Sequence, residues 1–312
     1  MSEIELHRKL LGDAVRNAAL EAALKKLIVP GKTTVADLGA GTGYLSFLAR
    51  KLGATHCTLV EYADTLDLAQ KLARDNRVSG LAFVKAHSSE IRKPPKVDLV
   101  ISETLGNFAL EENLLETLVD ARRFLKPGGR VLPCGLKQFV APVVKPRLQD
   151  ELDVWPGVAG GFDLSAARRV SLNNMYVKRV TPADLGAAAL TRQWDELDFS
   201  PSAEAPTSLR RASLAWPAGA LKAVHGFALW WEVELAPGVT LSTAPDAPAT
   251  HWDQIYLPLL EPLAPARDES VELTLTSDTR PEVGVRLGWR TRLLAGGRAK
   301  RSQSQDTLDG RL

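Results

Sequence analysis

The first 133 residues alternate between short apolar runs and helix-type patterns, and this alternation limits the folds that the chain can adopt. Strands that alternate with helices are joined by right-handed crossovers and form a mostly parallel sheet. The sequence therefore predicts an α/β domain over residues 1–133. The apolar spacing predicts helices over 5–28, from the glycines after residue 38 to about 52, over 64–77 and over 111–125, and strands at 35–38, 57–61, 81–84 and 97–101.

Beyond Pro133 the alternation stops, proline becomes frequent, and strand-type stretches follow one another. This pattern predicts a second, mainly antiparallel domain over 134–312, either a sandwich or a barrel. A segment with helix-like and loop-like pieces, at about 152–190, is expected to leave the body of this domain. The last dozen residues, from Arg301, are polar and are expected to be partly disordered. The expected strands are 136–144, 207–215, 224–235, 254–260, 270–276 and 283–294.

The composition is that of an ordinary soluble globular protein, because 45% of the 312 residues are hydrophobic and 24% are charged. A formal charge of only +2 argues against a global basic field for nucleic acid. No apolar run approaches the roughly 20 residues of a membrane span, and the start of the chain does not resemble a signal peptide. Cys57 and Cys134 form neither a disulfide framework nor a metal spacing, so we expect small buried thiols in a reducing cytoplasm.

A glycine-rich turn follows the first expected strand and opens a helix. In the run Asp37-Leu-Gly39-Ala-Gly41-Thr-Gly43, glycine lets the backbone approach a ligand closely. A dinucleotide fingerprint needs a further glycine three residues after the second one, and position 44 is Tyr. Glu61 closes the next strand, where it could accept both hydroxyls of a ribose. This arrangement resembles the cofactor motif of class I methyltransferases that use S-adenosylmethionine; a nicotinamide enzyme or a purely structural turn are the alternatives.

Two carboxylates follow the strand at 97–101. Glu103 and Glu112 belong to the run Ser-Glu-Thr-Leu-Gly-Asn-Phe-Ala-Leu-Glu-Glu over 102–112. Ligands of open α/β sheets bind outside the carboxyl ends of the strands. Two carboxylates at that edge could hold a planar cation such as guanidinium with paired hydrogen bonds. Two solvated surface glutamates are the simpler interpretation of this pair alone.

With the glycine turn and a distant Thr250-His251-Trp252 tripeptide, these residues resemble the protein arginine N-methyltransferase family. The loop that carries two glutamates in that family has one acid directly after Ser and another nine residues later, a spacing that Glu103 and Glu112 match and Glu111 does not. The resemblance implies a Rossmann-like methyltransferase domain followed by an antiparallel β-barrel domain with a helical dimerisation arm. Residues 161–165 are similar to part of that arm, which suits the excursion at 152–190.

The resemblance also implies a role for each matched residue. Glu103, Glu112, His251 and Asp13 would be catalytic, with Asp13 paired to His251 across the two domains. Arg16 would bind the methionine carboxylate of S-adenosylmethionine. Trp252 would join the two glutamates in binding an arginine-containing peptide or protein, the chain would form a homodimer, and no metal, membrane or specific nucleic acid is expected. The further cofactor-binding residues would be Asp37, Gly39, Gly41, Gly43, Glu61, Ser89 and Glu103.

Several positions depart from the family pattern. Thr104 replaces the more usual Trp or Pro, and Ser89 stands where many members have a glutamate for the adenine, with Glu90 next to it. Leu10 and Leu114 stand where members that make asymmetric dimethylarginine often have methionine. The aromatic segment that usually precedes the first matched helix is not expected in this chain. Free arginine or a small guanidino metabolite is therefore an alternative substrate, and a non-catalytic cofactor-binding scaffold is the alternative from another class.

Overall fold

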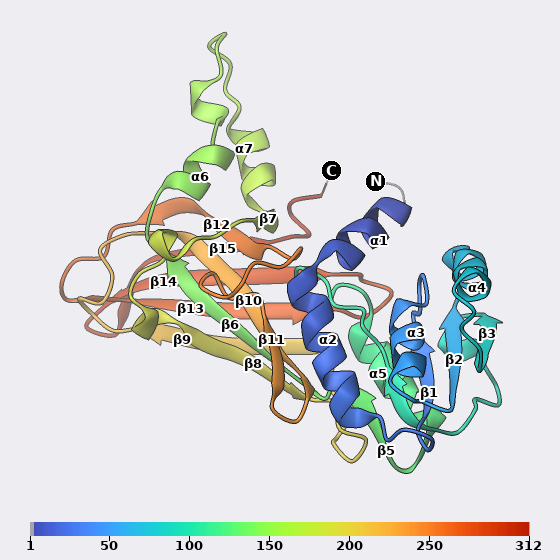
Figure 1. Ribbon diagram of the computed structural model, residues 1–312. Coiled ribbons are helices and arrows are strands. Elements are labelled where there is room, and N and C mark those ends of the chain that lie inside the picture. Colours follow the sequence, from blue (N-terminus) through green and yellow to red (C-terminus); the bar gives the residue numbers. More distant parts are fainter. Residues whose placement is uncertain (1–2, 312) are drawn as a thin grey trace.

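A five-stranded parallel sheet forms the first part of the molecule. The computed structural model describes residues 3–311, and Figure 1 shows this sheet beside a larger body of antiparallel strands. The strand order is β3-β2-β1-β4-β5, and every neighbouring pair is parallel. Apolar side chains such as Val35, Leu59 and Leu99 are fully buried, as expected for a sheet covered on both faces. The strands are β1 (Thr34–Leu38), β2 (His56–Glu61), β3 (Leu81–Lys85), β4 (Val97–Ile101) and β5 (Leu125–Leu132).

Five helices accompany this sheet. They are α1 (Glu3–Gly12), α2 (Ala14–Leu27), α3 (Tyr44–Lys51), α4 (Thr65–Asp75) and α5 (Leu114–Ala121). Asp13 separates the first two helices and caps α2, because its Oδ1 accepts a hydrogen bond of 2.9 Å from the backbone N–H of Arg16. The buried side of α2 includes Leu20 and Leu24. Since α2 packs against both α3 and β10 (Val224–Ala236), it joins the parallel sheet to the antiparallel body.

The antiparallel strands form two sheets. The first has the order β7-β12-β10-β6-β8, with β11 paired to β10, and the second has the order β15-β14-β13-β9. Their cores contain the fully buried rings of Trp216, Trp231 and Trp289. The prediction of a parallel α/β domain followed by a mainly antiparallel domain is therefore confirmed. The remaining strands are β6 (Gly135–Val143), β7 (Tyr176–Lys178), β8 (Arg192–Asp198), β9 (Leu209–Trp216), β11 (Val239–Ser242), β12 (Gln254–Leu263), β13 (Glu269–Asp278), β14 (Arg286–Ala295) and β15 (Arg298–Asp306).

Two expectations about elements were wrong. Residues 301–306 are not disordered, because they belong to β15, which pairs along its length with β14. The residues of β15 are polar because most of them face water, while the buried Gln305 is hydrogen-bonded to backbone carbonyls. The helix expected over 111–125 is shorter: α5 starts only at Leu114 and gives way after Ala121 to a short 3₁₀ turn.

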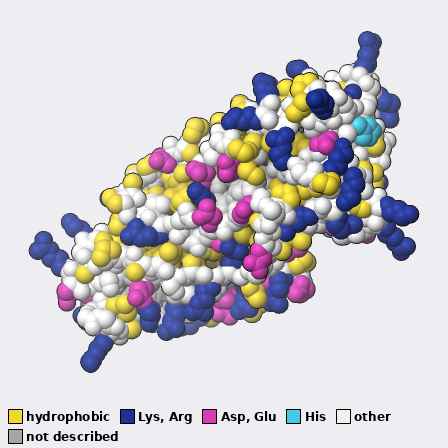
Figure 2. Space-filling model, turned by 90° about the horizontal axis from the view of Figure 1, so that it is seen from below, with side chains coloured by type: hydrophobic (Ala, Val, Ile, Leu, Met, Phe, Trp, Pro, Cys, Tyr) yellow, Lys and Arg dark blue, Asp and Glu magenta, His cyan; other side chains and the backbone are white. Residues whose placement is uncertain are grey.

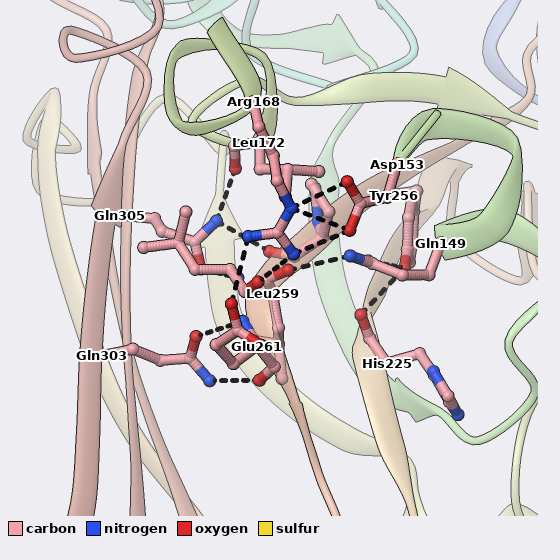
Figure 3. A network of polar contacts seen from close by, with 12 residues as sticks. Gln149, Asp153, Arg168, Leu172, His225, Tyr256, Leu259, Glu261, Gln303 and Gln305 are labelled. Atoms are coloured by element: carbon pink, nitrogen blue, oxygen red, sulfur yellow. Dashed lines mark hydrogen bonds and ion pairs between the residues drawn. The ribbon is translucent and has the colours of Figure 1, made fainter. Parts of the chain in front are cut away.

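The excursion that was expected at 152–190 leaves the antiparallel body as a helical arm (Figure 1). We define the arm as α6 (Arg147–Leu152), the connection 153–164 and α7 (Ser165–Leu172). Figure 3 shows how its base is fixed: Arg168 donates from Nε and Nη2 to the carboxylate of Asp153 and from Nη2 to the carbonyl of Leu260, at 2.6 Å. Gln305 on β15 also donates to the carbonyl of Leu172. The base of the arm is therefore tied to both antiparallel sheets.

The charged side chains are unevenly distributed. Seen from below, Lys and Arg gather on the end of the molecule that holds the parallel sheet, and acidic side chains are more frequent along the middle (Figure 2). Among residues 3–311, no helix is both long and apolar enough to cross a membrane.

Candidate active site

The glycine turn between β1 and α3 has the backbone conformation of a ligand cradle. Gly39 and Gly41 adopt φ values of 75° and 50°, in the left-handed region that favours glycine. A Cβ atom at Gly41 would lie 2.5 Å from Cε1 of His7, and one at Gly39 would lie 3.1 Å from Cγ2 of Thr104. Side chains at these positions would therefore fill the space above the turn.

Two acids hold this turn in place. Glu61, at the end of β2, accepts hydrogen bonds from the backbone N–H of Gly41 at 3.0 Å and of Ala63 at 2.9 Å. Asp37, at the end of β1, accepts a hydrogen bond of 2.8 Å from the hydroxyl of Ser46 on α3. Burial, with smaller contributions from the nearby carboxylates of Glu61 and Glu103, raises the pKa of Asp37 to about 6 despite this bond.

A cavity of about 540 Å³ opens above the turn. Its walls come from α1, the carboxyl ends of β1 and β2, the segment after β3, and the loop after β4, so it lies at the edge where open α/β sheets bind ligands. Glycine backbone, apolar side chains and a few convergent charged groups line it, as is usual for cofactor sites. The lining includes His7, Arg16, Asp37, Gly39, Gly41, Glu61, Ser88, Glu103, Thr104 and Glu112.

Glu103 and Glu112, in the loop at 102–112, line the cavity, whereas their neighbour Glu111 is not part of its lining. Glu111 turns back into the loop and accepts a hydrogen bond of 2.7 Å from the backbone N–H of Asn107. Glu112 remains exposed to the cavity, yet the loss of surrounding water there raises its pKa to about 7, with further contributions from Glu103 and Glu111. Glu103 and Glu112 thus present their carboxylates to the same cavity.

Glu103 pairs with Arg16 of α2. The guanidinium donates to Oε2 of Glu103 from Nε, at 2.8 Å, and from Nη2. The other carboxylate oxygen accepts a hydrogen bond of 3.3 Å from the backbone N–H of Leu105. The two side chains are only 7% and 4% exposed, so this is a buried ion pair at the wall of the cavity.

Asp13 and His251 join the two parts of the molecule beside this ion pair. Oδ2 of Asp13 lies 2.8 Å from both the backbone nitrogen and Nδ1 of His251. Burial lowers the pKa of His251, although Asp13 opposes this effect, so the ring is neutral at pH 7. Burial alone would raise the pKa of Asp13, but its hydrogen bonds from Arg16 and His251 hold the value below its usual range. A neutral ring that donates from Nδ1 keeps a lone pair on Nε2.

The antiparallel body also holds the loop that carries the glutamates. The indole of Trp252 donates a hydrogen bond of 2.8 Å to the carbonyl of Leu105, and the indole of Trp231 donates one of 3.0 Å to the carbonyl of Gly106. The backbone N–H of Asp253 donates to the side chain of Asn107 at 2.9 Å. Trp231 and Trp252 meet edge to face, with ring centroids 5.0 Å apart. Three successive residues of the loop are therefore fixed by donors from the other domain.

Two family models match the chain. The "Methyltransferase domain" model matches residues 31–165, and the "Arginine methyltransferase oligomerization subdomain" model matches residues 137–291. The chain is also 33% identical over 297 residues to protein arginine N-methyltransferase 6 of Xenopus tropicalis, covering 90% of this chain and 86% of that protein. The chain belongs to the protein arginine N-methyltransferase family. A second relative, protein arginine N-methyltransferase 1 of Dictyostelium discoideum, is 30% identical over 270 residues, which are 81% of this chain and 75% of the relative.

Solved structures of arginine methyltransferases share the fold. The Trypanosoma brucei PRMT1 enzyme–prozyme heterotetrameric complex with AdoHcy superimposes with a TM-score of 0.82 at 24% identity, over 96% of this chain and 97% of that chain. Arabidopsis thaliana protein arginine methyltransferase 10 gives 0.79 at 22% identity, over 96% of both chains. The predicted family, fold class, S-adenosylmethionine cofactor and arginine N-methyltransferase activity are confirmed at the level of the family.

The structure brings most of the expected arginine methyltransferase site residues together. Those that share the cavity wall are Arg16, Asp37, Gly39, Gly41, Glu61, Glu103 and Glu112. Gly43 instead begins α3 with a φ of 81°, and Trp252 is buried under the loop at 102–112. Ser88 faces the cavity, whereas Ser89 is exposed and its hydroxyl contacts the ring of His87 at 2.7 Å. Glu90 accepts a hydrogen bond from the backbone of His87.

Three residues of the site were not expected from the sequence. His7 lies over Gly41, and Trp231 and Asn107 fix the loop that carries the glutamates. His7 shares the helical segment with Asp13 and Arg16, so its position on that segment was the one available signal. Trp231 lies in an apolar strand and contacts a residue 125 positions away, which no local pattern reports. Among the described residues 3–311, no group of three or more His, Cys, Asp or Glu side chains is arranged to hold a metal.

Proposed function

We propose that this protein transfers a methyl group from S-adenosylmethionine to a terminal guanidino nitrogen of arginine residues in proteins. The observation that carries the proposal is that Glu103 and Glu112, spaced nine residues apart, line the same cavity as the glycine turn and Glu61. A site for a guanidinium and a site for an adenosyl cofactor thus adjoin in one cavity.

The residues of the cavity fit the cofactor. The open space above Gly39 and Gly41 admits a ligand close to the backbone, and Glu61 presents a carboxylate that can accept hydrogen bonds from ribose hydroxyls. Arg16 would bind the carboxylate of the methionine moiety, and Ser88, which lines the cavity, would contact the adenine. When bound, the cofactor supplies an electrophilic methyl group on a sulfonium.

The two glutamates would orient and polarise the arginine side chain. A free guanidinium has a pKa above 12 and a delocalised lone pair, so it is a poor nucleophile. Carboxylates on two of its nitrogens would hold positive charge there and leave more lone-pair density on the third. Placing this nitrogen in line with the methyl group can contribute about 7–11 kcal/mol to lowering the barrier. Held in this way, the nitrogen would be placed for a transfer in which a carbon–nitrogen bond forms as the carbon–sulfur bond of the cofactor breaks.

The transfer leaves one extra proton on the methylated guanidinium, and the site offers acceptors for it. His251 is neutral and keeps a lone pair on Nε2 when its Nδ1–H donates to Asp13. Glu112 is a second acceptor, since its pKa of about 7 lies near the working pH. We propose His251, supported by Asp13, as the group that takes the proton from the site.

We also propose a homodimer formed through the arm. Phe162, Val154 and Val158 on the arm are 79%, 56% and 48% exposed, and exposed apolar groups of this size mark interfaces. A cavity of about 730 Å³, lined by residues of α3 and of the end of α4 among others, offers apolar side chains against which a partner's Phe162 would fit. Two such contacts would make a two-fold, self-complementary dimer. The cavity is lined in part by Leu11, Tyr44, Phe47, Leu48, Leu72 and Val78.

These roles fall to two different parts of the chain. We propose that residues 1–133 form the cofactor-binding domain and residues 134–312 the substrate and dimerisation domain. A cytoplasmic location would suit the two cysteines, both of which are free thiols.

The test uses S-adenosylmethionine with a labelled methyl group. The protein is incubated separately with a Gly- and Arg-rich peptide, with the same peptide carrying Lys in place of Arg, and with free arginine, and products are identified by mass spectrometry. We expect label on the Arg peptide alone. Label on free arginine alone would assign a small guanidino substrate, and label on none, with retained binding of S-adenosylhomocysteine, would favour a non-catalytic scaffold.

A further inference from the structure

The opposite edge of the parallel sheet, away from the cofactor cavity, carries a concentration of cations. In a parallel sheet all strands begin at the same edge, so the segments that lead into the five strands meet there. We call these segments the basic edge: 29–33 before β1, 50–56 before β2, 74–80 before β3, 91–98 before β4 and 120–126 before β5. The view from below looks onto this edge, where Lys and Arg dominate the half of the surface over the parallel sheet (Figure 2).

The basic edge concentrates positive charge far beyond the average of the chain. Its five segments contain eleven Lys and Arg residues but only three acids, all of them Asp, whereas the whole chain has a formal charge of +2. The rest of the molecule is therefore net negative. A surface region that carries mostly positive charges produces a strong local potential that attracts polyanions, even on a protein whose total charge is close to zero.

The three acids of the basic edge neutralise only part of its charge. Asp98 pairs with Lys126 at 2.9 Å, Asp120 with Arg123 at 2.6 Å, and Asp75 with Lys71 of α4 at 2.6 Å. The other exposed cations of the edge make no ion pair within the described part of the chain. These are Lys32, Lys51, Arg74, Arg77, Arg92, Lys93 and Lys96.

One of these cations occupies a backbone position that favours a different residue. Arg77, directly after the end of α4, adopts a φ of 54°. Glycine or asparagine usually occupies this left-handed position after a helix. Arg77 thus places a cation at a position of the edge where a glycine would be less strained.

The unpaired cations extend from β3 to β4, over four of the five strands of the sheet. Following the strand order, Arg77 precedes β3, Lys32 precedes β1 and Lys93 precedes β4, while Lys51, before β2, also lines the cavity proposed for the partner's arm. Neighbouring strands are about 4.8 Å apart, so the row from β3 to β4 extends over roughly 14 Å. That length corresponds to about four phosphates along one strand of a duplex, at 3.4 Å each.

We propose that the basic edge binds the phosphate backbone of nucleic acid without sequence preference. A protein partner fits less well, because protein interfaces are poor in Lys and need an apolar centre, and the exposed members of this row are cations. The edge segments contain one Phe, Tyr or Trp, the buried Phe124, and His56 is their one exposed ring, so few rings are available to stack on bases. Contacts would therefore be made mainly with phosphates.

A nucleic acid held at the basic edge would leave the cofactor cavity accessible. The cavity lies at the carboxyl ends of the strands, and a strand of five residues spans about 17 Å. The inference does not depend on the proposed function, since it concerns binding alone. It would allow the enzyme to remain on a nucleic acid while its site acts on proteins bound to the same molecule.

Fluorescence anisotropy with a labelled single-stranded RNA of about 20 nucleotides tests the proposal. Between about 50 and 200 mM KCl we expect binding that weakens with a log–log slope near −3, which corresponds to about four phosphates. The variant Lys32→Glu/Arg92→Glu/Lys93→Glu should lose on the order of 100-fold in affinity at about 0.1 M salt. Its matched control, Lys222→Glu/Arg298→Glu/Arg301→Glu, changes three exposed cations of the antiparallel body and the same total charge, and should lose less than about 3-fold.

Three results would overturn the proposal. Undetectable RNA binding by the wild-type protein at about 50 mM salt would do so directly. An equal loss in both triple variants would mean that overall charge, and not the basic edge, governs binding. Poly-glutamate that displaces the RNA at equal charge concentration would identify the edge as a site for acidic proteins. The S-adenosylhomocysteine-induced rise in melting temperature, measured on each variant, shows that the fold and cofactor site are intact in every comparison.

Discussion

Arg16 donates two hydrogen bonds to a single carboxylate oxygen of Glu103, inside the wall of the cofactor cavity. The sequence had assigned these residues to different ligands, the methionine carboxylate for Arg16 and the substrate guanidinium for Glu103. In the structure each residue acts as the other's counter-ion. The pair thus compensates both buried charges inside the wall of the cavity.

Replacing Arg16 alone should destabilise the protein more than replacing Arg16 and Glu103 together. Arg16→Met leaves the buried Glu103 carboxylate without its cation, and breaking such a pair costs about 3–5 kcal/mol. Arg16→Met/Glu103→Gln removes both charges and should recover a large part of that loss. Urea unfolding of the wild-type protein, both single variants and the double variant measures the coupling. Additive losses would show that the two side chains do not depend on each other.

Replacing either cavity-lining glutamate should abolish most methyl transfer. Glu103→Gln and Glu112→Gln keep the size of the side chain but leave the guanidinium with one carboxylate, at about 3–5 kcal/mol, or a rate loss on the order of 10²–10³. Glu111→Gln is the matched control, because its amide oxygen can still accept the hydrogen bond from Asn107. Single-turnover rates with an Arg peptide provide the measurement. A damaging Glu111→Gln combined with an active Glu112→Gln would reverse the assignment.

The second-order rate constant kcat/KM should rise with pH through about 7. The pKa of Glu112 is raised to about 7, so below that pH the free enzyme holds a protonated, neutral carboxyl that binds guanidinium poorly. The free energy of unfolding should change with pH in the opposite direction. A carboxyl with a raised pKa stabilises the fold at low pH, and this contribution is lost as the pH rises through 7. Rate profiles between pH 5.5 and about 9 test this. The rise in kcat/KM near pH 7 should be absent in Glu112→Gln. A rise that remains in this variant would show that another group is responsible for it.

Trp252→Phe should impair transfer through the loop at 102–112. The change removes the indole donor to Leu105 and leaves a buried carbonyl unpaired, at about 1–3 kcal/mol. Trp216→Phe removes a similar indole–carbonyl bond, to Leu190, in the antiparallel body. Both variants should lose stability, but only Trp252→Phe should also lower kcat. Equal kcat values for the two variants would show that the indole of Trp252 does not position the glutamates.

Phe162→Ser should weaken the proposed dimer. Phe162 is 79% exposed at the arm, whereas Leu209, 58% exposed on β9, provides an apolar control outside the arm. Burying a Phe side chain contributes about 1.5–3 kcal/mol, and the dimer would contain two such contacts. Light scattering against protein concentration should show a shift to monomer for Phe162→Ser and none for Leu209→Ser. A wild-type protein that is monomeric at every accessible concentration would refute the dimer.

Local chemistry made much of the fold and site predictable. Glycines in a strand–turn–helix context, an acid at the end of the next strand, and two glutamates after β4 are arranged by a parallel sheet at one edge. The order of the strands therefore brings residues that are far apart in the sequence close together in space. The pairing of Asp13 with His251 followed from the family resemblance, because 238 residues separate them and no periodicity connects them.

Features that depend on polar side chains facing inward were missed. Gln305 on the inner side of β15 and Thr307 directly after the strand are buried, with their polar groups satisfied by hydrogen bonds, so this segment lacks an apolar alternation. The basic edge was missed for another reason. Its cations are scattered over five segments, and only the strand order places them in a row.

The hydrogen bonds from Trp231, Trp252 and Asp253 to the loop at 102–112 have a consequence for the protein as a whole. The first domain contains both glutamates but does not contain the groups that set their positions. The first part of the chain alone would therefore lack a competent acceptor site, although it contains both glutamates. A mutation that loosens the contact between the parallel sheet and the antiparallel body would lower methyl transfer even where it leaves every residue of the cofactor cavity unchanged.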